Sequence, residues 1–384
     1  MQRTKPRAAQ PAKRKISAEP APSGPDEELE RLRGRIDALD TALLGLLSER
    51  ADIASAVGKL KAKAARPTFH DPKREERVLA RVAKHGAGRF PERAIRNVFR
   101  EIMSGCLAVE DALRVAFLGP QGTFSQMAAK ELFGLSARYV ESTSIDGVVD
   151  SVVRGDAVYG VVPFENSTEG SVGSTHDLLL ESEIYVRGEH VVPIAQSLLS
   201  RASSLGRIER VYSHPQALGQ CRLWLAKHTP RAQLVQTAST ALAVQEAEGD
   251  EAAAAVGSAL AGQLLGVPVL RAVISDRPEN ATRFFVLGKE RTAPTGNDRT
   301  TLVFAAPDDN KKGALRRVLS LFEAHDVNLT RIESRPSRKR AWDYVFFADV
   351  LGHEDDANLR AALGKLRRTS KFVKVCGSYP VAAR

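Results

Sequence analysis

The chain has 384 residues, which is longer than one ordinary domain, so two to four domains are expected. Apolar residues make up 43% of it, and the mean hydropathy of −0.23 is typical of a soluble protein. The most apolar long window, residues 252–270, is interrupted by Ser258, Gln263 and Pro268. We therefore expect a buried helix and a strand there, and no membrane span.

The net charge of +10 is concentrated in one segment. The first acidic residue is Glu19, and the basic residues before it are Arg3, Lys5, Arg7, Lys13, Arg14 and Lys15. Because this segment is rich in Pro and Ala and has no apolar periodicity, residues 1–25 are expected to form a disordered basic tail. A weak electrostatic anchor or a targeting peptide is the alternative. No apolar segment follows, which argues against a secretory signal.

The three cysteines, Cys106, Cys221 and Cys376, are far apart in the sequence. An odd number at such spacing indicates neither a disulfide framework nor a zinc site, and it fits a reducing cytoplasm. The eight histidines are scattered without ligand spacing. No metal and no cofactor is therefore expected.

The sequence predicts one uninterrupted helix over residues 26–65, with acidic residues at its positive end. At about 1.5 Å per residue it would be about 60 Å long. Its apolar residues repeat at spacings of three and four, as in a heptad seam: Leu29, Leu32, Ile36, Leu39, Leu43, Leu46, Ile53, Val57 and Leu60. A helix of this length cannot bury its seam within one small domain, so we expect an intertwined homodimer.

Cations interrupt this apolar seam. Arg50 lies in the gap between Leu46 and Ile53, and Lys61 lies three turns later on nearly the same face. Arg33 is too distant to meet Arg50 within one straight helix, but it could do so across a dimer. A guanidinium among leucines is costly unless it is paired. Two hypotheses remain: structural ion pairs with acids of neighbouring helices, or a buried pocket for a dianion.

Two further helices are predicted, one beginning near Asp71 and one over residues 91–110. The apolar face of the second is expected to include Val98, and steps of four from there reach Cys106 and Glu110. Eight residues in this region resemble the active site of the all-helical chorismate mutases: Arg33, Arg50, Lys61, Asp71, Arg74, Glu75, Cys106 and Glu110.

This resemblance implies a domain over residues 26–112 in which Arg33 reaches the site of the partner protomer. The arginines would clamp the two carboxylates of chorismate, and Lys61 would stabilise the charge growing on its ether oxygen. Well-known bifunctional members usually carry Gln where Glu110 stands. A carboxylate there helps only when protonated, so we expect its pKa to be raised in an enclosed site. Cys106 replaces a Ser that is often found there, and any small side chain suffices.

Four polar segments follow, each beside a short apolar run: residues 119–125, 162–167, 212–216 and 280–284. Strands are expected over residues 113–118, 159–164, 211–213 and 284–287, with helices over 125–133 and from about 175. Such segments lie at the mouth of an open α/β sheet, and together they indicate a two-lobed cleft for a small anion. No nucleotide-binding P-loop is present. Taken singly, each segment is equally typical of ordinary capping and turn chemistry.

Together these segments resemble prephenate dehydratase over residues 113–297, and Thr282-Arg283-Phe284 is that family's most diagnostic motif. The resemblance implies two α/β lobes, similar to periplasmic ligand-binding proteins. It assigns Thr282 as the donor to the leaving hydroxyl, while Glu165 is either an acid or a support for Thr282 or Asn166. Arg283 either binds substrate or pairs with an acid such as Asp276. The candidate substrate-binding residues are Thr123, Ser125, Asn166, Ser167, Ser213, His214, Ser239, Thr240, Arg283 and Phe284, although His214 is more typical of a turn.

Residues 298–384 show a strand-helix-strand-strand-helix-strand pattern, which predicts an α+β ferredoxin-like unit. It resembles the ACT regulatory domain, which in dehydratases binds phenylalanine between paired domains. The matching residues are Gly313, Ala314, Leu315, Asn328, Leu329, Glu333, Ser334, Arg335 and Pro336. The alternative is a purely structural dimerisation module.

Residues 26–384 as a whole resemble the bifunctional chorismate mutase–prephenate dehydratases. The family implies chorismate and prephenate as substrates, phenylalanine as allosteric inhibitor, no nucleic-acid or membrane partner, and a cytoplasmic homodimer. The rival hypotheses are a non-catalytic amino-acid sensor with the same lobes and a nucleic-acid binder suggested by charge alone. Arogenate is a second possible substrate, but the attached mutase makes prephenate.

Overall fold

The computed structural model describes residues 25–62, 72–85, 90–110, 112–277, 279–306, 312–337 and 344–382. The predicted tail up to residue 24, Asp71 and the side chain of Glu110 lie outside the described residues. The chain divides into two compact units, Met1–Ile53 and Ala54–Arg384. Within the described ranges, none of the helices combines the length and the apolar character needed to span a bilayer.

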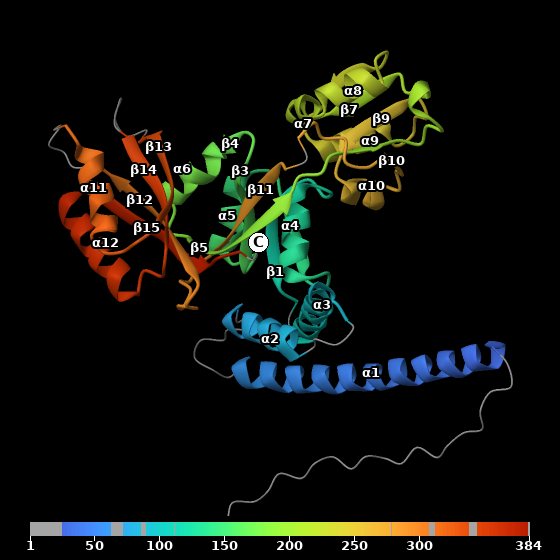
Figure 1. Ribbon diagram of the computed structural model, residues 1–384, viewed down its shortest axis with the longest axis horizontal. Helices are drawn as coiled ribbons and strands as arrows, with labels where there is room; N and C mark the ends of the chain where they lie inside the picture. The colour runs from blue at the N-terminus through green and yellow to red at the C-terminus, as the bar shows by residue number, and fades with distance from the viewer. Residues whose placement is uncertain are drawn as a thin grey trace, which may run out of the picture. The chain divides into compact units, whose positions relative to one another are not determined.

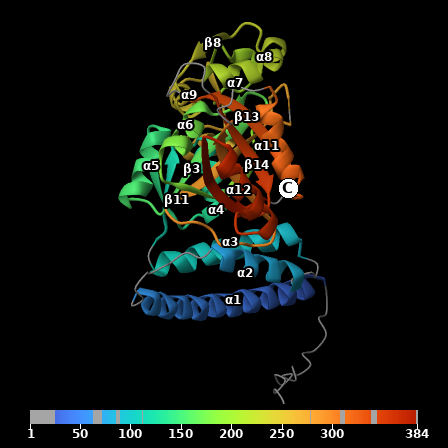
Figure 2. The same ribbon diagram turned by 90° about the vertical axis from the view of Figure 1, so that its left-hand side faces the viewer.

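Helix α1 (Pro25–Ala62) confirms the predicted long helix and is unbroken in both views (Figures 1 and 2). Asp26, Glu27 and Glu28 occupy its first turn, where carboxylates offset the helix dipole. The nine apolar residues of its predicted seam are between 42% and 70% exposed in the single chain. In proteins, a heptad seam of this kind is covered by another helix.

Helices α2 (Pro72–His85) and α3 (Glu92–Glu110) follow. Ile95, Met103 and Cys106 make the buried stripe of α3, whereas Val98 is 47% exposed. In the single chain, Val98 therefore lies outside the buried stripe of α3. The opposite flank of α3 receives backbone N–H groups from the loop that follows α4: Leu135 donates to Glu101 Oε2 at 2.9 Å and Ser136 to Ser104 Oγ at 3.3 Å.

The first lobe is built on a sheet with the order β2-β1-β3-β11-β5. Strands β1, β2 and β3 are parallel to one another, and β11 runs antiparallel to both of its neighbours, β3 and β5. The strands are β1 (Arg114–Leu118), β2 (Arg138–Ser142), β3 (Tyr159–Asn166), β5 (Tyr185–Pro193) and β11 (Ala281–Gly288), with the short β4 (Gly170–Ser171) on β3. Its helices are α4 (Phe124–Phe133), α5 (Ile145–Arg154) and α6 (Gly173–Glu181). Strand β3 runs two residues beyond its predicted end and so includes Glu165 and Asn166.

The second lobe is a sheet of order β10-β6-β9-β7-β8. Its elements are β6 (Ser197–Leu199), a short 3₁₀ turn (Leu205–Arg207), β7 (Arg210–Ser213), α7 (Pro215–Gln220), α8 (Arg222–His228), β8 (Gln233–Gln236), α9 (Thr240–Ala247), β9 (Ala253–Gly257), α10 (Ala259–Leu265) and β10 (Val269–Arg271). The chain crosses between the lobes twice, and these crossings are hydrogen-bonded: Ile194 N–H donates to Asn280 O and Ile274 N–H to Gln196 O, each at 2.8 Å. The predicted two-lobed α/β architecture is confirmed.

Gly122 in the glycine-containing segment allows the two lobes to touch. Its φ is +83°, and a Cβ there would lie 2.9 Å from Cα of Ala261 in the second lobe. Ser258 Oγ donates to the Gly122 carbonyl at 2.6 Å across the same contact. Gly122 belongs to the segment for which the sequence predicts an anion site. In the structure, this glycine lets the backbones of the two lobes approach each other closely.

The third sheet has the order β13-β14-β12-β15, antiparallel throughout, and confirms the ferredoxin-like prediction. Its elements are β12 (Asp298–Ala305), α11 (Ala314–Glu323), β13 (Leu329–Pro336), β14 (Tyr344–Leu351), α12 (Ala357–Thr369) and β15 (Phe372–Pro380). Helices α11 and α12 cover the same face of it (Figure 1). The other face packs on the first lobe, where Phe347 and Tyr379 share one core with Phe164 and Phe285.

Candidate active site

Two polar side chains meet where β3 and β11 run side by side. Asn166 Nδ2 donates to Thr282 Oγ1 and to Asn280 Oδ1, each at 2.9 Å. Asn166 Oδ1 accepts the backbone N–H groups of Thr168 and Glu169, at 2.9 and 3.1 Å, which fixes the orientation of the amide. Because Thr282 Oγ1 accepts from Asn166, its own proton is available to another acceptor, and none among the described residues receives it.

A cavity of about 420 Å³ lies between the lobes, and Asn280 connects it to this pair, since Asn280 lines the cavity whereas Asn166 and Thr282 do not. It is lined by Thr168, Glu169 and Asn280 from the first lobe and the linker, and by Gln216, Gly219, Gln220, Arg222, Leu223, Asp276 and Arg277 from the other side. Asn280 is 4% exposed, and its Nδ2 has no hydrogen-bond partner among the described residues. Two guanidiniums and an unpaired amide donor suit an anion with more than one carboxylate.

A second cavity, of about 490 Å³, lies between α5 and α6 and has the opposite charge. Asp146, Asp150, Asp177 and Glu181 are among its lining residues. Four carboxylates would repel an anionic ligand. The cleft between the lobes is therefore the candidate site for such a ligand.

Several predicted substrate-binding residues serve as helix caps. Thr123, His214 and Ser239 cap α4, α7 and α9 and accept backbone N–H groups there. Ser213 is fully buried and donates to the Val256 carbonyl at 2.6 Å. These four residues, together with Ser125 and Thr240, are absent from the lining of the 420 Å³ cavity, as are Asn166, Ser167 and Thr282, but they also lack the contact with Asn280 that Asn166 and Ser167 make. The capping interpretation is the one that their geometry supports.

Phe284 and Ser167 have different surroundings. Phe284 is 2% exposed in the core of the first lobe, with Phe117 and Val161, which corrects the expectation that it binds substrate. Ser167 Oγ donates to Asn280 Oδ1 at 3.3 Å and accepts from Ala281 N at 3.0 Å. Of these two, only Ser167 belongs to the polar group beside the cavity.

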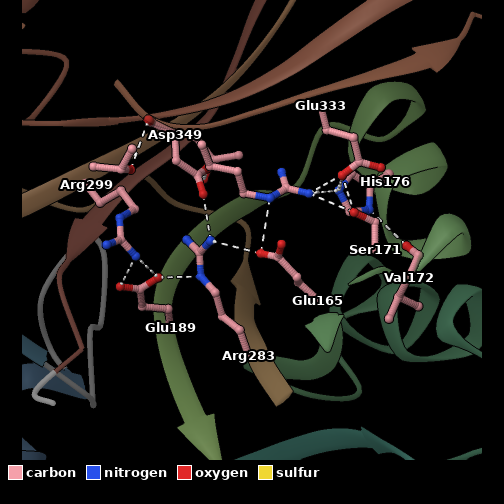
Figure 3. A network of polar contacts seen from close by, with 12 residues as sticks. Glu165, Ser171, Val172, His176, Glu189, Arg283, Arg299, Glu333 and Asp349 are labelled. Atoms are coloured by element: carbon pink, nitrogen blue, oxygen red, sulfur yellow. Dashed lines mark hydrogen bonds and ion pairs between the residues drawn. The ribbon is translucent and has the colours of Figure 1, made fainter. Parts of the chain in front are cut away.

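Arg283 points away from the cavity. Its Nε donates to Glu189 at 2.7 Å and its Nη1 to Asp349 at 2.6 Å (Figure 3). Asp276, which sequence reasoning offered as its partner, instead accepts the backbone N–H groups of Leu223 and Trp224, each at 2.9 Å. The interpretation of Arg283 as a partner for acids is supported, and the acid named for it is corrected.

Glu165 lies on the same side as Arg283. Its carboxylate is 3.1 Å from Arg331 Nε and 3.9 Å from Arg283 Nη1. Successive residues of a strand face opposite sides, so Glu165 is directed away from the side on which Asn166 meets Thr282. This corrects the expectation of an acid at the leaving group. The alternative, a support for Thr282 or Asn166, stays a prediction, since the side-chain partners of Glu165 are Arg331 and Arg283.

The predicted mutase residues differ in their exposure. Arg33 pairs with Glu30 at 2.6 Å, and its side chain is 61% exposed. Arg50 and Lys61 are half-buried, Arg74 is exposed and Glu75 is half-buried, while Cys106 is buried in α3. An exposed ion pair such as that of Arg33 contributes little and exchanges readily for another partner. With Asp71 and the Glu110 side chain outside the described residues, the mutase site stays a prediction.

The predicted regulatory residues lie at the start of α11 and along β13. Gly313 adopts a left-handed conformation before α11, and the Asn328 carbonyl accepts Leu351 N–H at 2.9 Å. Side chains alternate on β13: Glu333 bonds Ser171 of the first lobe, and Arg335 lies 3.5 Å from Asp177. Ser334, which lies between them on the strand, is exposed. The remaining predicted regulatory positions are Ala314 and Leu315 in α11 and Leu329 and Pro336 in β13.

None of the ten residues that line the cavity was an individual substrate-binding candidate in the sequence, and the polar ones that were missed include Gln220, Arg222, Arg277 and Asn280. Asn280 stands two residues before Thr282, so strand alternation carries it to the same side. Gln220 stands one helical turn after Gln216, and its amide bridges Glu169 and Gln196 at 3.3 Å each. The strand period at Asn280 and the helix period at Gln220 can both be read from the sequence, but neither period shows that these residues line a cavity. Across the described ranges, no three His, Cys, Asp or Glu side chains are grouped as a metal site would require.

Three family models match successive parts of the chain: chorismate mutase type II over residues 32–111, prephenate dehydratase over 115–292, and the ACT domain over 308–368. A bifunctional chorismate mutase/prephenate dehydratase of Aquifex aeolicus is 44% identical over 360 residues, 93% of this chain and 99% of that protein. The prephenate dehydratase of Arthrobacter aurescens, solved in complex with L-Phe, is 35% identical with a TM-score of 0.65, over 70% of this chain and 90% of that one.

A further solved structure, titled as a novel type of quorum quenching acylase, is 30% identical with a TM-score of 0.63 over 70% of this chain and 98% of that one. The fold of the two lobes therefore carries another activity in that protein, and function has to be argued from the site. The match to the Aquifex aeolicus protein, in contrast, extends through the helical region as well. The chain belongs to the family of bifunctional chorismate mutase/prephenate dehydratases.

Proposed function

We infer that the chain rearranges chorismate to prephenate, and then converts prephenate to phenylpyruvate by removing CO₂ and the ring hydroxyl. The observation that carries the second activity is the Asn166–Thr282 hydrogen bond, which Asn166 links through Asn280 to the cavity between the lobes. It leaves the Thr282 proton available to the departing hydroxyl. Both reactions belong to phenylalanine biosynthesis.

The dehydratase step needs a proton donor and a grip on a dianion. As the ring carboxylate leaves as CO₂, its bonding electrons enter the ring, and the hydroxyl departs with a proton as water. Thr282 is a poor acid in water, so its contribution rests on placement beside that oxygen. Arg222 and Arg277 at the cavity, with Asn280 Nδ2, supply charge and donors for the carboxylates. Aromatisation of the ring supplies the driving force.

The mutase step is pericyclic and needs no nucleophile. The protein must hold the compact conformer of chorismate and stabilise negative charge on the ether oxygen. We assign the first task to Arg33, Arg50 and Arg74, and the second to Lys61 with a protonated Glu110. Asp71, Glu75 and Cys106 complete the site in this assignment. A homodimer formed along α1 is supported by the exposed apolar seam of that helix.

Phenylalanine is the proposed feedback inhibitor. The support is the ACT family match and the relative from Arthrobacter aurescens, whose structure is titled as a complex with L-Phe. We place the domains at residues 26–112, 113–297 and 298–384, in keeping with the ranges of the three family matches. A cytoplasmic location is part of the same proposal, and the three cysteines are free and buried.

The test supplies chorismate to the purified full chain and follows prephenate and phenylpyruvate, with and without phenylalanine. Wild type should accumulate both products in sequence. Thr282→Ala should stop at prephenate, with phenylpyruvate formation reduced by about 100-fold or more. Thr282→Ser, which keeps the hydroxyl, is the matched control and should retain most of the activity. Binding of phenylalanine without any turnover would instead establish the amino-acid sensor.

A further inference from the structure

The two residues of the proposed dehydratase pair have neighbours that form a second pair behind them. In the register of β11 and β3, Thr282 stands opposite Asn166, and Arg283 stands opposite Glu165. Paired residues of neighbouring strands share a face, and successive residues alternate. Thr282 and Asn166 therefore lie on the side of the cleft, whereas Arg283 and Glu165 lie on the opposite side, against the ACT sheet.

Residues of the ACT sheet hold both members of this rear pair. Asp349 on β14 accepts from Arg283 Nη1 at 2.6 Å, and the Tyr379 hydroxyl on β15 accepts from Arg283 Nη2 at 2.9 Å. Arg331 on β13 pairs with Glu165 at 3.1 Å. The side chain of Asp349 is 1% exposed and Tyr379 is fully buried. Charge-assisted contacts in such a dry place are short and directional.

The guanidinium of Arg283 is fixed from every side. Each of its three nitrogens donates to a protein group, because Nε is bound to Glu189 of β5 in addition to the two ACT contacts. Its carbon lies 4.9 Å from the centre of the Phe285 ring, and only 12% of the side chain is exposed. Three of its five N–H groups are used by these partners, which hold the guanidinium toward β5 and the ACT sheet. Because three partners hold the planar guanidinium, a displacement of any one of them also shifts Arg283 and the strand β11 to which it belongs.

We propose that Arg283 is a positioning residue that couples the ACT sheet to the dehydratase pair and does not bind prephenate. Asp349 and Tyr379 fix Arg283, and β11 carries that position to the adjacent Thr282. Arg331 acts in parallel through Glu165 on Asn166. The quantity under control is the 2.9 Å contact between Asn166 Nδ2 and Thr282 Oγ1.

A route for the effector follows from the same contacts. Arg331 lies on β13 between Leu329 and Glu333, two of the predicted phenylalanine-binding positions. Glu333 in turn bonds Arg331 and Ser171 of the first lobe. A ligand that moves β13 thus displaces Arg331 and, through Glu165, the amide of Asn166. This part rests on the proposed regulation by phenylalanine, whereas the role of Arg283 in unregulated turnover does not.

The decisive experiment compares kcat and KM for prephenate in the full chain carrying Arg283→Lys, Tyr379→Phe or Arg291→Lys. Lysine keeps the charge of Arg283 but not its fork, and phenylalanine keeps the ring of Tyr379 but not its hydroxyl. Arg291 is the matched control. It pairs with Glu354 of the ACT domain at 2.6 Å and stacks on Tyr185 of the first lobe, with 53% of its side chain exposed.

For Arg283→Lys, kcat should fall about tenfold or more while KM stays within about twofold, since a displaced group loses rate before it loses ground-state binding. Tyr379→Phe should show the same split at smaller amplitude, and Arg291→Lys should show neither change. A higher KM at unchanged kcat for Arg283→Lys would establish direct substrate binding and overturn the proposal. Unchanged kcat in both Arg283→Lys and Tyr379→Phe would overturn it as well.

Phenylalanine inhibition of the same proteins gives the second readout. The half-inhibitory concentration should rise about fivefold or more in Arg331→Lys and Arg283→Lys but not in Arg291→Lys, with phenylalanine binding itself measured by calorimetry. Inhibition identical to wild type in the first two variants would overturn the coupling. Wild type without any inhibition would refute the proposed regulation alone, and the kcat and KM comparison would still decide the role of Arg283. Mutase turnover in every variant reports that the helical domain is folded, and thermal unfolding followed by circular dichroism reports the same for the dehydratase and ACT domains.

Discussion

The side-chain amide of Asn166 shows how one residue can set the chemistry of its neighbour. It donates to Thr282 Oγ1 and Asn280 Oδ1 and accepts two backbone N–H groups, and its oxygen and nitrogen cannot exchange places because an NH₂ group cannot accept those two backbone N–H groups. A hydroxyl that accepts from an amide is free to donate its own proton. Asn166 thus selects the direction of the Thr282 proton.

Asn166→Asp provides a test of this orientation. The carboxylate would accept the Thr282 proton and keep it from the leaving hydroxyl, so we expect kcat for prephenate to fall by about 100-fold or more. Asn166→Ala leaves Thr282 free to rotate and should retain more activity than Asn166→Asp, although Asp is closer to Asn in shape. Steady-state kinetics on prephenate decides this, with mutase turnover as the folding control. Higher activity in Asn166→Asp than in Asn166→Ala would contradict the proposed donor role.

His176 on α6 is a buried titratable group at the junction with the ACT sheet. Burial lowers its pKa to about 4, the carbonyl of Val172 opposes that shift, and Arg331 adds to it. Its Nδ1 is 2.9 Å from the Val172 carbonyl, and its Nε2 is 3.2 Å from Arg331 Nη2. The lowered pKa and the contact with Arg331 both identify a neutral ring, so the 3.7 Å approach of Glu333 is not an ion pair at neutral pH.

The pH dependence of stability follows from this shift. Below pH 6.5 the unfolded chain binds a proton at His176 that the folded chain refuses until about pH 4, so the free energy of unfolding falls as pH is lowered through that window, by about 3 kcal/mol in all. His176→Asn should lose less thermal stability than wild type between pH 6.5 and 4.5. The control is His325→Asn, whose ring makes the same contact with the carbonyl four residues earlier but is half-exposed. Equal losses in wild type and His176→Asn, measured as Tm by calorimetry, would refute the assignment.

At the scale of elements, local patterns predicted α1 and the whole ferredoxin-like unit. Spacings of three and four define α1, and alternating apolar residues define strands such as β12 and β14. The strand period would also have placed Arg283 and Thr282 on opposite faces. It could not reveal that the ACT sheet covers the face of Arg283, because Asp349 and Tyr379 come from a separate part of the chain.

The errors at this scale have a common physical cause. Val98 was assigned to a buried face because it is apolar, yet in the single chain α3 buries Ile95, Met103 and Cys106 and leaves Val98 exposed. Phe284 and Ser213 were read as ligand contacts because they belong to polar segments at strand ends, yet Phe284 is buried in the core and Ser213 bonds a neighbouring strand. Sequence identifies which residues end a strand, whereas tertiary packing decides which of them remain available.

At the scale of the whole molecule, α1 leaves a seam that a single chain does not cover. Leu39 and Leu46 are 65% and 62% exposed, and the other seam residues resemble them. Apolar surface of that extent is covered in water by association, and a heptad seam is best covered by an identical helix. A dimer along this seam could bring Arg33 of one protomer to the mutase site of the other, where Arg50 is proposed to act.

Complementation between two inactive variants tests this shared site. Arg33→Ala and Arg50→Ala should each abolish mutase turnover and leave the dehydratase reaction intact. When the two chains are co-expressed, about half of the dimers are mixed, and in each of them one site has both arginines while the other has neither. Purified mixtures should therefore regain about a quarter of the wild-type mutase rate. No recovery, with mixed dimers verified by two affinity tags, would mean that both arginines serve a site within one chain, whereas full activity of Arg33→Ala alone would mean that Arg33 has no role in it.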